Sequence, residues 1–345
     1  MVNKIFILLF FSFILAQDYP VLGSDESLDV MTWNVQNYPK HSQTNSYIND
    51  IIEQINIDII AFQEIEDEDD FSSLISSLSG NWVGYRSGSP SSTYGELSYA
   101  INLQEISVNS LYTILNQDAY YFAYREPYVL EFTHQGVEYV MINNHFKCCG
   151  DGDLDNNDSW DEEYRRLISS QLLDEYINQN FNDDKVIILG DLNDSVTDNE
   201  SDNVFLNFLN SEYYQIADYS IANGPSSNWS YPTWPSHIDH IIITDELFED
   251  FDESNILTFK VDDYLNGGWN AYDNYVSDHR PVFMKLNSSN FILGDLNQDG
   301  YVDILDVIVI VNTILSDDYS SIADMNNDGT LNVVDVVIIV NEILN

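Results

Sequence analysis

The stretch Val186-Ile187-Ile188-Leu189-Gly190-Asp191-Leu192-Asn193 decides the fold of this chain. Its four consecutive apolar residues, Val186–Leu189, indicate a strand that is covered on both of its faces. Polar residues follow directly, so this strand ends in side chains that can do chemistry. The same arrangement, a short apolar strand beside a polar motif, recurs along the chain between residues 28 and 286.

Short β-rich runs alternate with helical patterns over this whole region. Strands are expected at Leu28–Trp33, Ile57–Phe62, Leu97–Asn102, Tyr128–Thr133, Val137–Asn143, Val186–Leu189, Ile238–Ile243 and Val282–Leu286. Helices are expected at Ser46–Ile55, Asp161–Asn178 and Asp202–Asn210. This alternation predicts an α/β (α+β) sandwich in one large domain, residues 28–287, followed by a polar linker at 288–290.

The first residues have the composition of an export signal. Lys4 precedes an apolar run from Ile5 to Leu15, and Ala16 ends that run. The run is too short to span a bilayer core, which needs about 20 residues. We therefore expect residues 1–16 to be a signal peptide of a secreted protein, with an uncleaved anchor as the alternative. No later segment reads as a membrane span.

The chain is strongly acidic, with 58 Asp and Glu against 11 Lys and Arg and a formal net charge of −47. A protein that binds a polyanion through Lys and Arg needs a basic face, and eleven basic residues can hardly provide one. A metal ion would then have to supply positive charge toward a phosphorylated substrate. The aromatic content of 13% argues against a wholly disordered acidic chain.

An internal repeat follows the linker, in two copies that begin at Asp295 and Asp324. Each copy has oxygen-bearing side chains at loop positions 1, 3, 5, 9 and 12 and glycine at position 6, which is the pattern of a calcium-binding loop. Such loops lead into helices, so we expect helices despite the Val and Ile that follow. The expected calcium ligands are Asp295, Asn297, Asp299, Asp303 and Asp306, then Asp324, Asn326, Asp328, Asn332 and Asp335.

The repeat resembles a type I dockerin domain over residues 291–345. The resemblance implies two calcium-dependent loop–helix units that dock onto a cohesin-like protein. Loop positions 10 and 11 usually lie near the docking surface, and here they are Ile304-Leu305 and Val333-Val334. Cellulosomal dockerins commonly carry Ser/Thr pairs there. The partner's identity is therefore open, and a contact with the main domain of the same chain is the alternative.

Six short polar motifs stand at strand ends in the main domain. Carboxylate and amide oxygens suit Mg²⁺, Mn²⁺ or Ca²⁺, and histidines suit proton transfer near neutral pH. Hydrolysis of a phosphate ester needs both, because a metal offsets phosphate charge while a base activates water. A single buried Asp or His is more often structural, but six motifs in one order are more specific. Their polar residues include Asn34, Glu64, His145, Asp191, Asn193, Asp239, Asp278 and His279.

In this order the motifs resemble those of the endonuclease/exonuclease/phosphatase superfamily, over about Leu28–Leu286. The resemblance implies a four-layer sandwich of two packed β-sheets with helices outside, and catalysis with Mg²⁺ or Mn²⁺. It also implies that Asn34, Glu64 and Asp278 lie at the metal, with Glu64 as its principal ligand.

The same resemblance assigns the remaining site residues. His145 would bind the scissile phosphate or act as one acid or base. Asp191 would orient or deprotonate the attacking water, and Asn193 would contact the phosphate. His279 would be the other acid or base, polarised by Asp239.

Two further matches concern residues outside the six motifs. Arg125 resembles the arginine with which deoxyribonucleases contact DNA, so it is expected to bind substrate. Glu96 stands where those enzymes carry a glutamate paired with the first catalytic histidine, so it is expected to partner His145. The alternative for both is an ordinary surface salt bridge, worth under about 1 kcal/mol.

Three local features admit two interpretations each. Asp151, Asp153, Asp155 and Glu162 match a calcium loop, and an acidic solvated loop is the alternative. The segment Trp229–Pro235 carries aromatic residues that either stack on bases or pack in the core. Cys148 and Cys149 are either two reduced buried thiols or a vicinal disulfide.

These observations favour a secreted, monomeric, metal-dependent nuclease that acts on DNA or RNA and carries a docking tail. A phosphodiesterase or phosphatase of lipid or small phosphates, similar to sphingomyelinases, is the second hypothesis, because fold alone does not separate them. A catalytically silent scaffold or adhesion protein is the third hypothesis.

Overall fold

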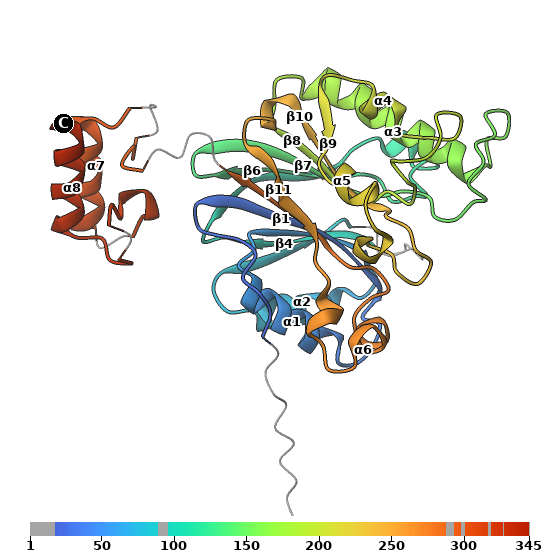
Figure 1. The fold of residues 1–345 in the computed structure, drawn as a ribbon, viewed down its shortest axis with the longest axis horizontal. Coiled ribbons are helices and arrows are strands. Elements are labelled where there is room, and N and C mark those ends of the chain that lie inside the picture. The colour runs from blue at the N-terminus through green and yellow to red at the C-terminus, as the bar shows by residue number, and fades with distance from the viewer. Residues whose placement is uncertain are drawn as a thin grey trace, which may run out of the picture.

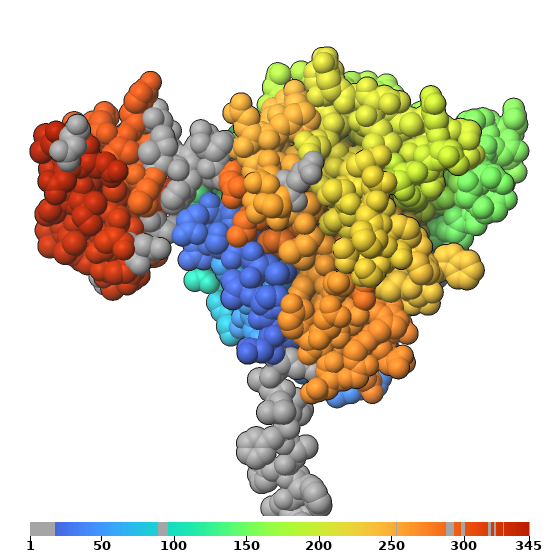
Figure 2. Space-filling model, viewed as in Figure 1, coloured from blue at the N-terminus to red at the C-terminus, as the bar shows by residue number. Residues whose placement is uncertain are grey.

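The computed structural model describes residues 18–88, 96–287, 293–297, 301–316, 319–326 and 328–344. The expected signal peptide at 1–16, the linker at 288–290 and the calcium-ligand candidate Asp299 lie outside the described residues. Figure 2 shows the described residues between 18 and 287 as one body, coloured blue to orange, and the described residues from 301 onward as a second, smaller body in red.

The first β-sheet has six strands in the order β11-β12-β1-β2-β4-β3. Strands β1 and β2 run parallel, and the other neighbours run antiparallel. Helix α1, Thr44–Ile55, joins the parallel pair, as a parallel connection requires. The strands are β1 Ser27–Tyr38, β2 Ile59–Ile65, β3 Trp82–Arg86, β4 Glu96–Asn102, β11 Phe251–Thr258 and β12 Val282–Asn287.

The second sheet repeats this plan in the order β5-β6-β7-β8-β10-β9. Strands β7 and β8 form its parallel pair, and helix α3, Glu162–Asn180, joins them. Each sheet therefore has a parallel pair inside it whose carboxyl ends share one edge. The strands are β5 Ile106–Thr113, β6 Tyr128–His134, β7 Val137–His145, β8 Val186–Asp191, β9 Tyr214–Ile216 and β10 Asp239–Thr244.

Three apolar layers hold the domain together. Ile187 and Leu189 face the core between the sheets, whereas Val186 and Ile188 face the core under α3. This alternation confirms that the Val186 strand is covered on both faces. Helices α1, α2 (Glu68–Ser77) and α6 (Gly268–Tyr275) cover the outer face of the first sheet (Figure 1). The result is the expected four-layer sandwich.

All eight strands expected from the sequence are present. The helix expected at Asp202–Asn210 is shorter in the structure, where α4 spans only Leu206–Leu209. The Asn203 amide donates to the carbonyl oxygens of Val196 and Asp198, at 3.0 and 3.3 Å, and these bonds favour a turn over a helix. The elements not expected are the short or edge strands β3, β5, β9 and β11, and helices α2, α5 (Tyr219–Ala222) and α6.

The C-terminal unit contains two helices, α7 at Ile304–Leu315 and α8 at Val333–Leu344, which lie side by side (Figure 1). Asp303 caps α7 by accepting from Leu305 N at 2.7 Å, while Asp306 accepts from Asp303 N at 2.8 Å. This capping box explains why a segment rich in Val and Ile becomes helical. The small core consists of Ile310, Ala323, Met325 and Ile339.

Short 3-10 turns at Asn116–Asp118, Ser226–Asn228, Asp245–Leu247, Val261–Tyr264 and Ser321–Ala323 complete the elements. Within the part of the chain that the structure describes, every helix is too short or too polar to cross a bilayer.

Gly190 brings the carboxyl ends of β7 and β8 close together. Its φ is +145°, and a Cβ atom there would lie 1.9 Å from the carbonyl oxygen of Asn144. No side chain other than glycine's hydrogen fits this approach. The pairing continues one residue further, where His145 lies opposite Asp191. Gly190 therefore sets two candidate catalytic residues side by side.

Candidate active site

The polar strand ends of both sheets line one cleft of about 730 Å³. The two sheets contribute Glu64 from β2, His145 from β7 and Asp191 from β8, and the segment before β12 contributes Asp278 and His279. The cleft thus brings together residues from distant parts of the sequence. Its lining also includes Gln36, Asn37, Asn193, Tyr231 and Trp234.

Asp191 lies at the centre of the site and is buried. Its Oδ2 accepts from Asn34 Nδ2 at 2.8 Å, and its Oδ1 accepts from Asn193 N at 3.1 Å. Its Oδ2 also lies 3.5 Å from His145 Nε2 and 3.9 Å from His279 Nε2. Burial, together with the charges of neighbouring carboxylates, raises the pKa of Asp191 to about 7. It is therefore poised to exchange a proton near neutral pH.

His279 is paired with Asp239, as expected. Its Nδ1 lies 2.8 Å from Asp239 Oδ2, and the two side chains are buried. Burial opposes a charge on the ring, but Asp239 and Asp191 outweigh it and raise the pKa of His279 to about 10. The Nδ1 proton is thus held by Asp239, and a protonated Nε2 faces Asp191. The carbonyl oxygen of His279 accepts from the hydroxyl of Tyr272 at 2.6 Å, which fixes the backbone.

His145 differs from His279 in its charge state. Burial, Arg125 and His279 all lower the pKa of His145 well below its usual range, so its ring is neutral. Its Nδ1 has no hydrogen-bond partner among the described residues. The site therefore combines one neutral and one protonated imidazole on either side of Asp191.

Glu96 and Arg125 are placed differently from the sequence expectation. Glu96 accepts from Ser87 Oγ at 3.0 Å, and no ion pair joins it to His145 within the described ranges. Arg125 is buried and donates to the carbonyl oxygens of His145 and Phe146, at 3.1 and 2.7 Å. These carbonyls stand where β7 leaves the sheet, and a guanidinium fork satisfies both. Arg125 thus holds the backbone at His145 through these two hydrogen bonds, and it is not among the residues that line the cleft.

Glu64 and Asp278 carry oxygen atoms of the kind that bind a divalent metal ion. Glu64 accepts from Asn34 Nδ2 at 3.1 Å and from Asn37 N at 2.7 Å. Asp278 accepts from Gln36 Nε2 at 2.6 Å through Oδ2, while its buried Oδ1 has no hydrogen-bond partner in the described structure. Carboxylate oxygens of Glu64 and Asp278 in one cleft suit a hard cation such as Mg²⁺ or Mn²⁺.

Asn34 and Asn193 act as connectors in this site. Asn34 Nδ2 donates to both Glu64 and Asp191, so it links the metal-ligand candidate to the central carboxylate. Asn193, at φ +55°, donates from Nδ2 to Phe146 O at 3.2 Å. Gln36 was not expected from the sequence, because nothing in its local pattern connects it to Asp278, 242 residues away.

A second cluster with metal-ligand residue types is purely structural. Asp218 Oδ2 lies 2.9 Å from His237 Nε2 and 2.6 Å from His240 Nδ1, and all three side chains are buried. His237 Nδ1 accepts from Ser230 N, and His240 Nε2 faces the carbonyl oxygen of Asp194 at 2.9 Å. Every ring nitrogen is therefore engaged, and His240 must carry protons on both nitrogens. Neither described histidine keeps a free ring-nitrogen lone pair for a metal.

The acidic loop before α3 gathers a different set from the expected one. Asp153 and Asp155 are exposed, and Glu162 lies 3.5 Å from Lys147 Nζ. Asp151 instead lies with Asp161 and Glu163, whose ligand atoms all fall within 4.8 Å of one another. The reason is that α3 begins at Glu162, which turns Glu163 rather than Glu162 inward.

The structure also bears on the two interpretations of the segment Trp229–Pro235 and of the pair Cys148 and Cys149. Trp229 donates from Nε1 to Ile221 O at 3.1 Å, whereas Trp234 is 78% exposed and lines the cleft. Cys148 and Cys149 are free thiols, as the first interpretation expected, but Cys149 is exposed and Cys148 only partly buried, so the expected burial is wrong. Both line the cleft, with their Sγ atoms 3.0 Å apart.

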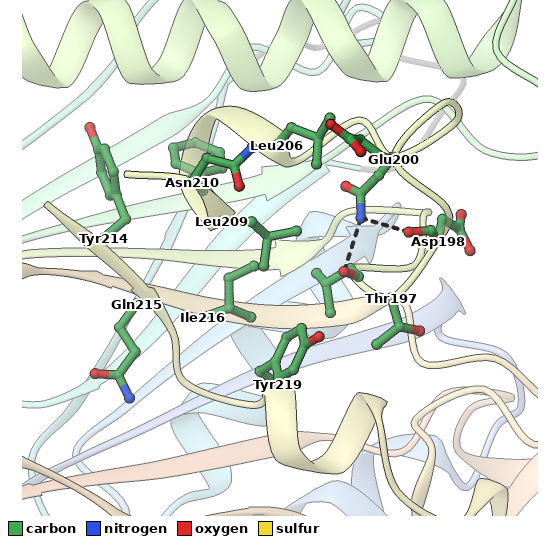
Figure 3. A pocket seen from close by; sticks show the side chains of 13 residues that line it. Thr197, Asp198, Glu200, Leu206, Leu209, Asn210, Tyr214, Gln215, Ile216 and Tyr219 are labelled. Atoms are coloured by element: carbon green, nitrogen blue, oxygen red, sulfur yellow. Dashed lines mark hydrogen bonds between the residues drawn. The ribbon is translucent and has the colours of Figure 1, made fainter. Parts of the chain in front are cut away.

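A second hollow, of about 710 Å³, lies beside the loop that Asn203 holds (Figure 3). Its charged lining residues are Asp198 and Glu200, and no Lys, Arg or His lines it. Among the described residues it therefore offers no basic side chain to a phosphate.

Most of the arginines in the described chain are inside the protein. Arg280 makes a two-bonded pair with Asp262, at 2.8 and 2.6 Å, and Arg166 pairs with Asp194 at 2.7 Å. Arg125 and Arg165 are likewise buried, and both donate to backbone carbonyls. Few positive charges are thus left for the surface.

The loops of the C-terminal unit direct acidic side chains inward. Asp295, Asp306, Asp324 and Asp335 are buried. Asp324 accepts from the N–H groups of Asp328 and Gly329, at 3.2 and 2.8 Å. Asp335 accepts from Asn332 N through Oδ2, but its buried Oδ1 has no hydrogen-bond partner among the described residues. Such an unpaired oxygen fits a calcium ligand at loop position 12.

Comparison with known families identifies two regions. A family model described as the Endonuclease/Exonuclease/phosphatase family matches residues 31–279, and the Dockerin type I domain model matches residues 293–344. No curated protein matches the sequence.

Solved structures share the fold of the main domain. TDP2 from D. rerio, complexed with single strand DNA product, has a TM-score of 0.57 over 76% of this chain and 99% of that chain, at 12% identity. The human Nocturnin catalytic domain with bound sulfate has a TM-score of 0.53 over 75% of this chain and 93% of that chain, at 16% identity. An endonuclease/exonuclease/phosphatase from Bacteroides vulgatus has a TM-score of 0.52 over 75% and 98%, at 17% identity.

The Asp218 cluster predicts a pH-dependent stability. Its histidines lower the pKa of Asp218 against the effect of burial, and Asp218 raises that of His240. The Asp218 contribution is present above the ordinary Asp pKa of about 3.9 and is lost as pH falls. The His240 contribution is complete below the ordinary His pKa of about 6.5 and is lost as pH rises through the folded pKa.

Asp218→Asn should therefore destabilise most between these two pH values, by about 3 kcal/mol, because it breaks a buried pair. Chemical denaturation from pH 3 to 9 measures this difference, with Asp153→Asn as the exposed control. A destabilisation that is constant over that range would contradict the charged pair.

Proposed function

Because the chain belongs to the endonuclease/exonuclease/phosphatase family, whose members are generally phosphoester hydrolases, we propose that it is a secreted, metal-dependent nuclease. The observation that carries this proposal is the placement of Asp191 between a neutral His145 and a protonated His279, in the cleft that Glu64 also lines. The type I dockerin domain supports an extracellular location, because such domains occur in extracellular proteins.

The chain's own groups divide the work of hydrolysis. Asp191, with its pKa near neutrality, accepts the proton of the water whose oxygen attacks phosphorus. His279, held by Asp239, gives its Nε2 proton to the oxygen whose bond to phosphorus breaks. His145 places a neutral Nε2 beside Asp191, within reach of a phosphate oxygen.

Glu64 and Asp278, joined through Asn34 and Gln36, would hold the divalent cation. Mg²⁺ or Mn²⁺ would offset the negative charge of the phosphate, which the acidic surface of this chain cannot do.

Nucleic acid is the favoured substrate because aromatic rings stand in the cleft. Trp234 is 78% exposed there, although burying a tryptophan would normally be favourable. Tyr231 lies with its ring centroid 4.7 Å from that of His279, so the aromatic lining reaches the reacting groups. Such surfaces stack on unpaired bases without sequence preference. The TDP2 structure with a single strand DNA product is consistent with a nucleic acid ligand on this fold.

The C-terminal unit would attach the enzyme to a cohesin-like protein. The residues at loop positions 10 and 11 are exposed, with Ile304 at 61% and Val333 at 69%. The second helical turn continues this apolar face through Ile308 and Val337 in equivalent places. An apolar surface repeated in both helices suits a protein partner, and calcium would be needed to form it.

The nuclease assignment predicts the effect of removing His279. His279→Ala should lower the rate of plasmid or single-stranded DNA cleavage in Mg²⁺ or Mn²⁺ by about 10²- to 10⁴-fold, because it removes the acid. The exposed His41, which does not line the cleft, supplies the matched control His41→Ala. A panel of DNA, RNA, sphingomyelin and phosphomonoesters measures the substrate. Hydrolysis of sphingomyelin or a phosphomonoester without cleavage of either nucleic acid would contradict the nuclease proposal.

Trp234→Ala tests base stacking separately from chemistry. Loss of one stacked base costs about 1–3 kcal/mol, so KM for single-stranded DNA should rise by about 5- to 150-fold. Turnover of a small phosphodiester such as bis-(p-nitrophenyl) phosphate should not change. Trp160→Ala, at a residue that is 75% exposed and outside the cleft, is the control. Equal KM values for the two variants on DNA would argue against stacking at Trp234.

Chelation tests the calcium loops. EGTA should reduce the helical circular-dichroism signal of the full chain, because α7 and α8 depend on buried acidic loops that calcium neutralises. Asp335→Asn should reproduce part of this loss without chelator. A signal that is indifferent to EGTA in wild type would show that the loops fold without calcium.

A further inference from the structure

The loop between β7 and α3 carries a carboxylate cluster that the proposed reaction does not use. Asp151, Asp161 and Glu163 place one ligand atom each within 4.8 Å of the others. Asp151 and Glu163 also line the cleft, together with Gly150 and Gly152. The cluster therefore stands in the wall of the cleft, outside the set of residues around Asp191.

One carboxylate oxygen of Glu163 has no hydrogen-bond partner in the described structure. The Glu163 side chain is 2% exposed, its Oε1 accepts from Gly152 N at 2.8 Å, and the same oxygen forms an ion pair with Arg166 Nη2 at 3.0 Å. Its Oε2 is buried and has no hydrogen-bond partner among the described residues. A buried carboxylate oxygen without a hydrogen-bond partner carries a desolvation cost, even when the other oxygen of the same group is paired. A cation bound by Oε2 would remove that cost.

The positive side chains near Asp151, Asp161 and Glu163 are too few to neutralise these three carboxylates. Arg166 is shared, since it lies 3.0 Å from Glu163 and 2.7 Å from Asp194. Lys147 is directed to Glu162. The N-terminus of α3 accounts for Asp161, which caps it by accepting from Tyr164 N at 2.7 Å, but not for Asp151. One positive charge thus faces several carboxylates.

We propose that Asp151, Asp161 and Glu163 bind a structural calcium ion. The ligand atoms are carboxylate oxygens with no histidine or thiolate among them, which suits a hard cation. Asp151 is exposed, so water can complete the six to eight ligands that calcium takes. The ion would tie the loop to the start of α3 and reduce the negative charge in the cleft wall.

The position of Trp160, next to Asp161 in the sequence, supplies a specific probe. Tb³⁺ replaces calcium and emits when a nearby tryptophan is excited, and residues 291–345 contain no tryptophan. Excitation at tryptophan-selective wavelengths therefore does not report the dockerin loops. The full chain should show Tb³⁺ emission that Ca²⁺ displaces and that Trp160→Phe largely removes.

Asp151→Asn and Glu163→Gln should each weaken this Tb³⁺ binding by about tenfold or more. Asp153→Asn should bind as wild type does, because Asp153 is not part of the cluster. Asp151 is exposed, so its variant keeps the test valid if Glu163→Gln fails to fold. Absence of Trp160-dependent emission, wild-type affinity in Asp151→Asn, or an equal loss in Asp153→Asn would overturn the proposal.

Discussion

The side-chain amide of Asn34 joins the two sheets at the active site. It belongs to the first sheet, and it donates to Glu64 at 3.1 Å in that sheet and to Asp191 at 2.8 Å in the second sheet. Its backbone carbonyl accepts from Ser277 Oγ at 2.6 Å, which fixes the segment that leads to His279. One residue therefore sets the distance between the metal-ligand candidate, the central carboxylate and the acid. The packing of the sheets has to keep that distance constant.

The electrostatics of the site follow from this arrangement. Asp191 lies buried near other carboxylates, and its burial, together with the charges of Asp239 and Glu64, raises its pKa to about 7. Burial lowers the pKa of both histidines, but the charges of Asp239 and Asp191 outweigh it at His279, whereas the charge of Arg125 adds to it at His145. His279 faces Asp239, whereas His145 lies in front of Arg125. A protonated His279 and a neutral His145 thus lie on either side of Asp191, and ordinary charged neighbours are enough to give the two rings different charge states.

The sequence predicted the strand interiors and the polar residues at their ends, because continuous apolar runs and short motifs are local signals. Val186–Leu189 and its following Asp191 are the clearest example. Contacts between residues that are far apart in the sequence could not be predicted from such local signals. Gln36 reaches Asp278 only in the folded chain, and Arg125 turns inward because carbonyls at the end of β7 need a donor. The inward orientation of Glu163 could have been predicted from the helix periodicity, because the residue at which α3 begins decides which glutamate faces the interior.

The burial of Arg125, Arg165, Arg166 and Arg280 has a consequence for how this protein meets its ligands. Since these four of the chain's 11 basic residues are internal, the outer surface is more uniformly anionic than the formal charge suggests. Nucleic-acid binding proteins normally lose affinity as salt rises, because counterions compete with their basic groups. Here the dominant long-range force toward a polyanion is repulsion, which salt screens over about 10 Å at 0.1 M. Encounter would therefore become faster as ionic strength increases, the reverse of the usual dependence, and saline surroundings would favour the approach.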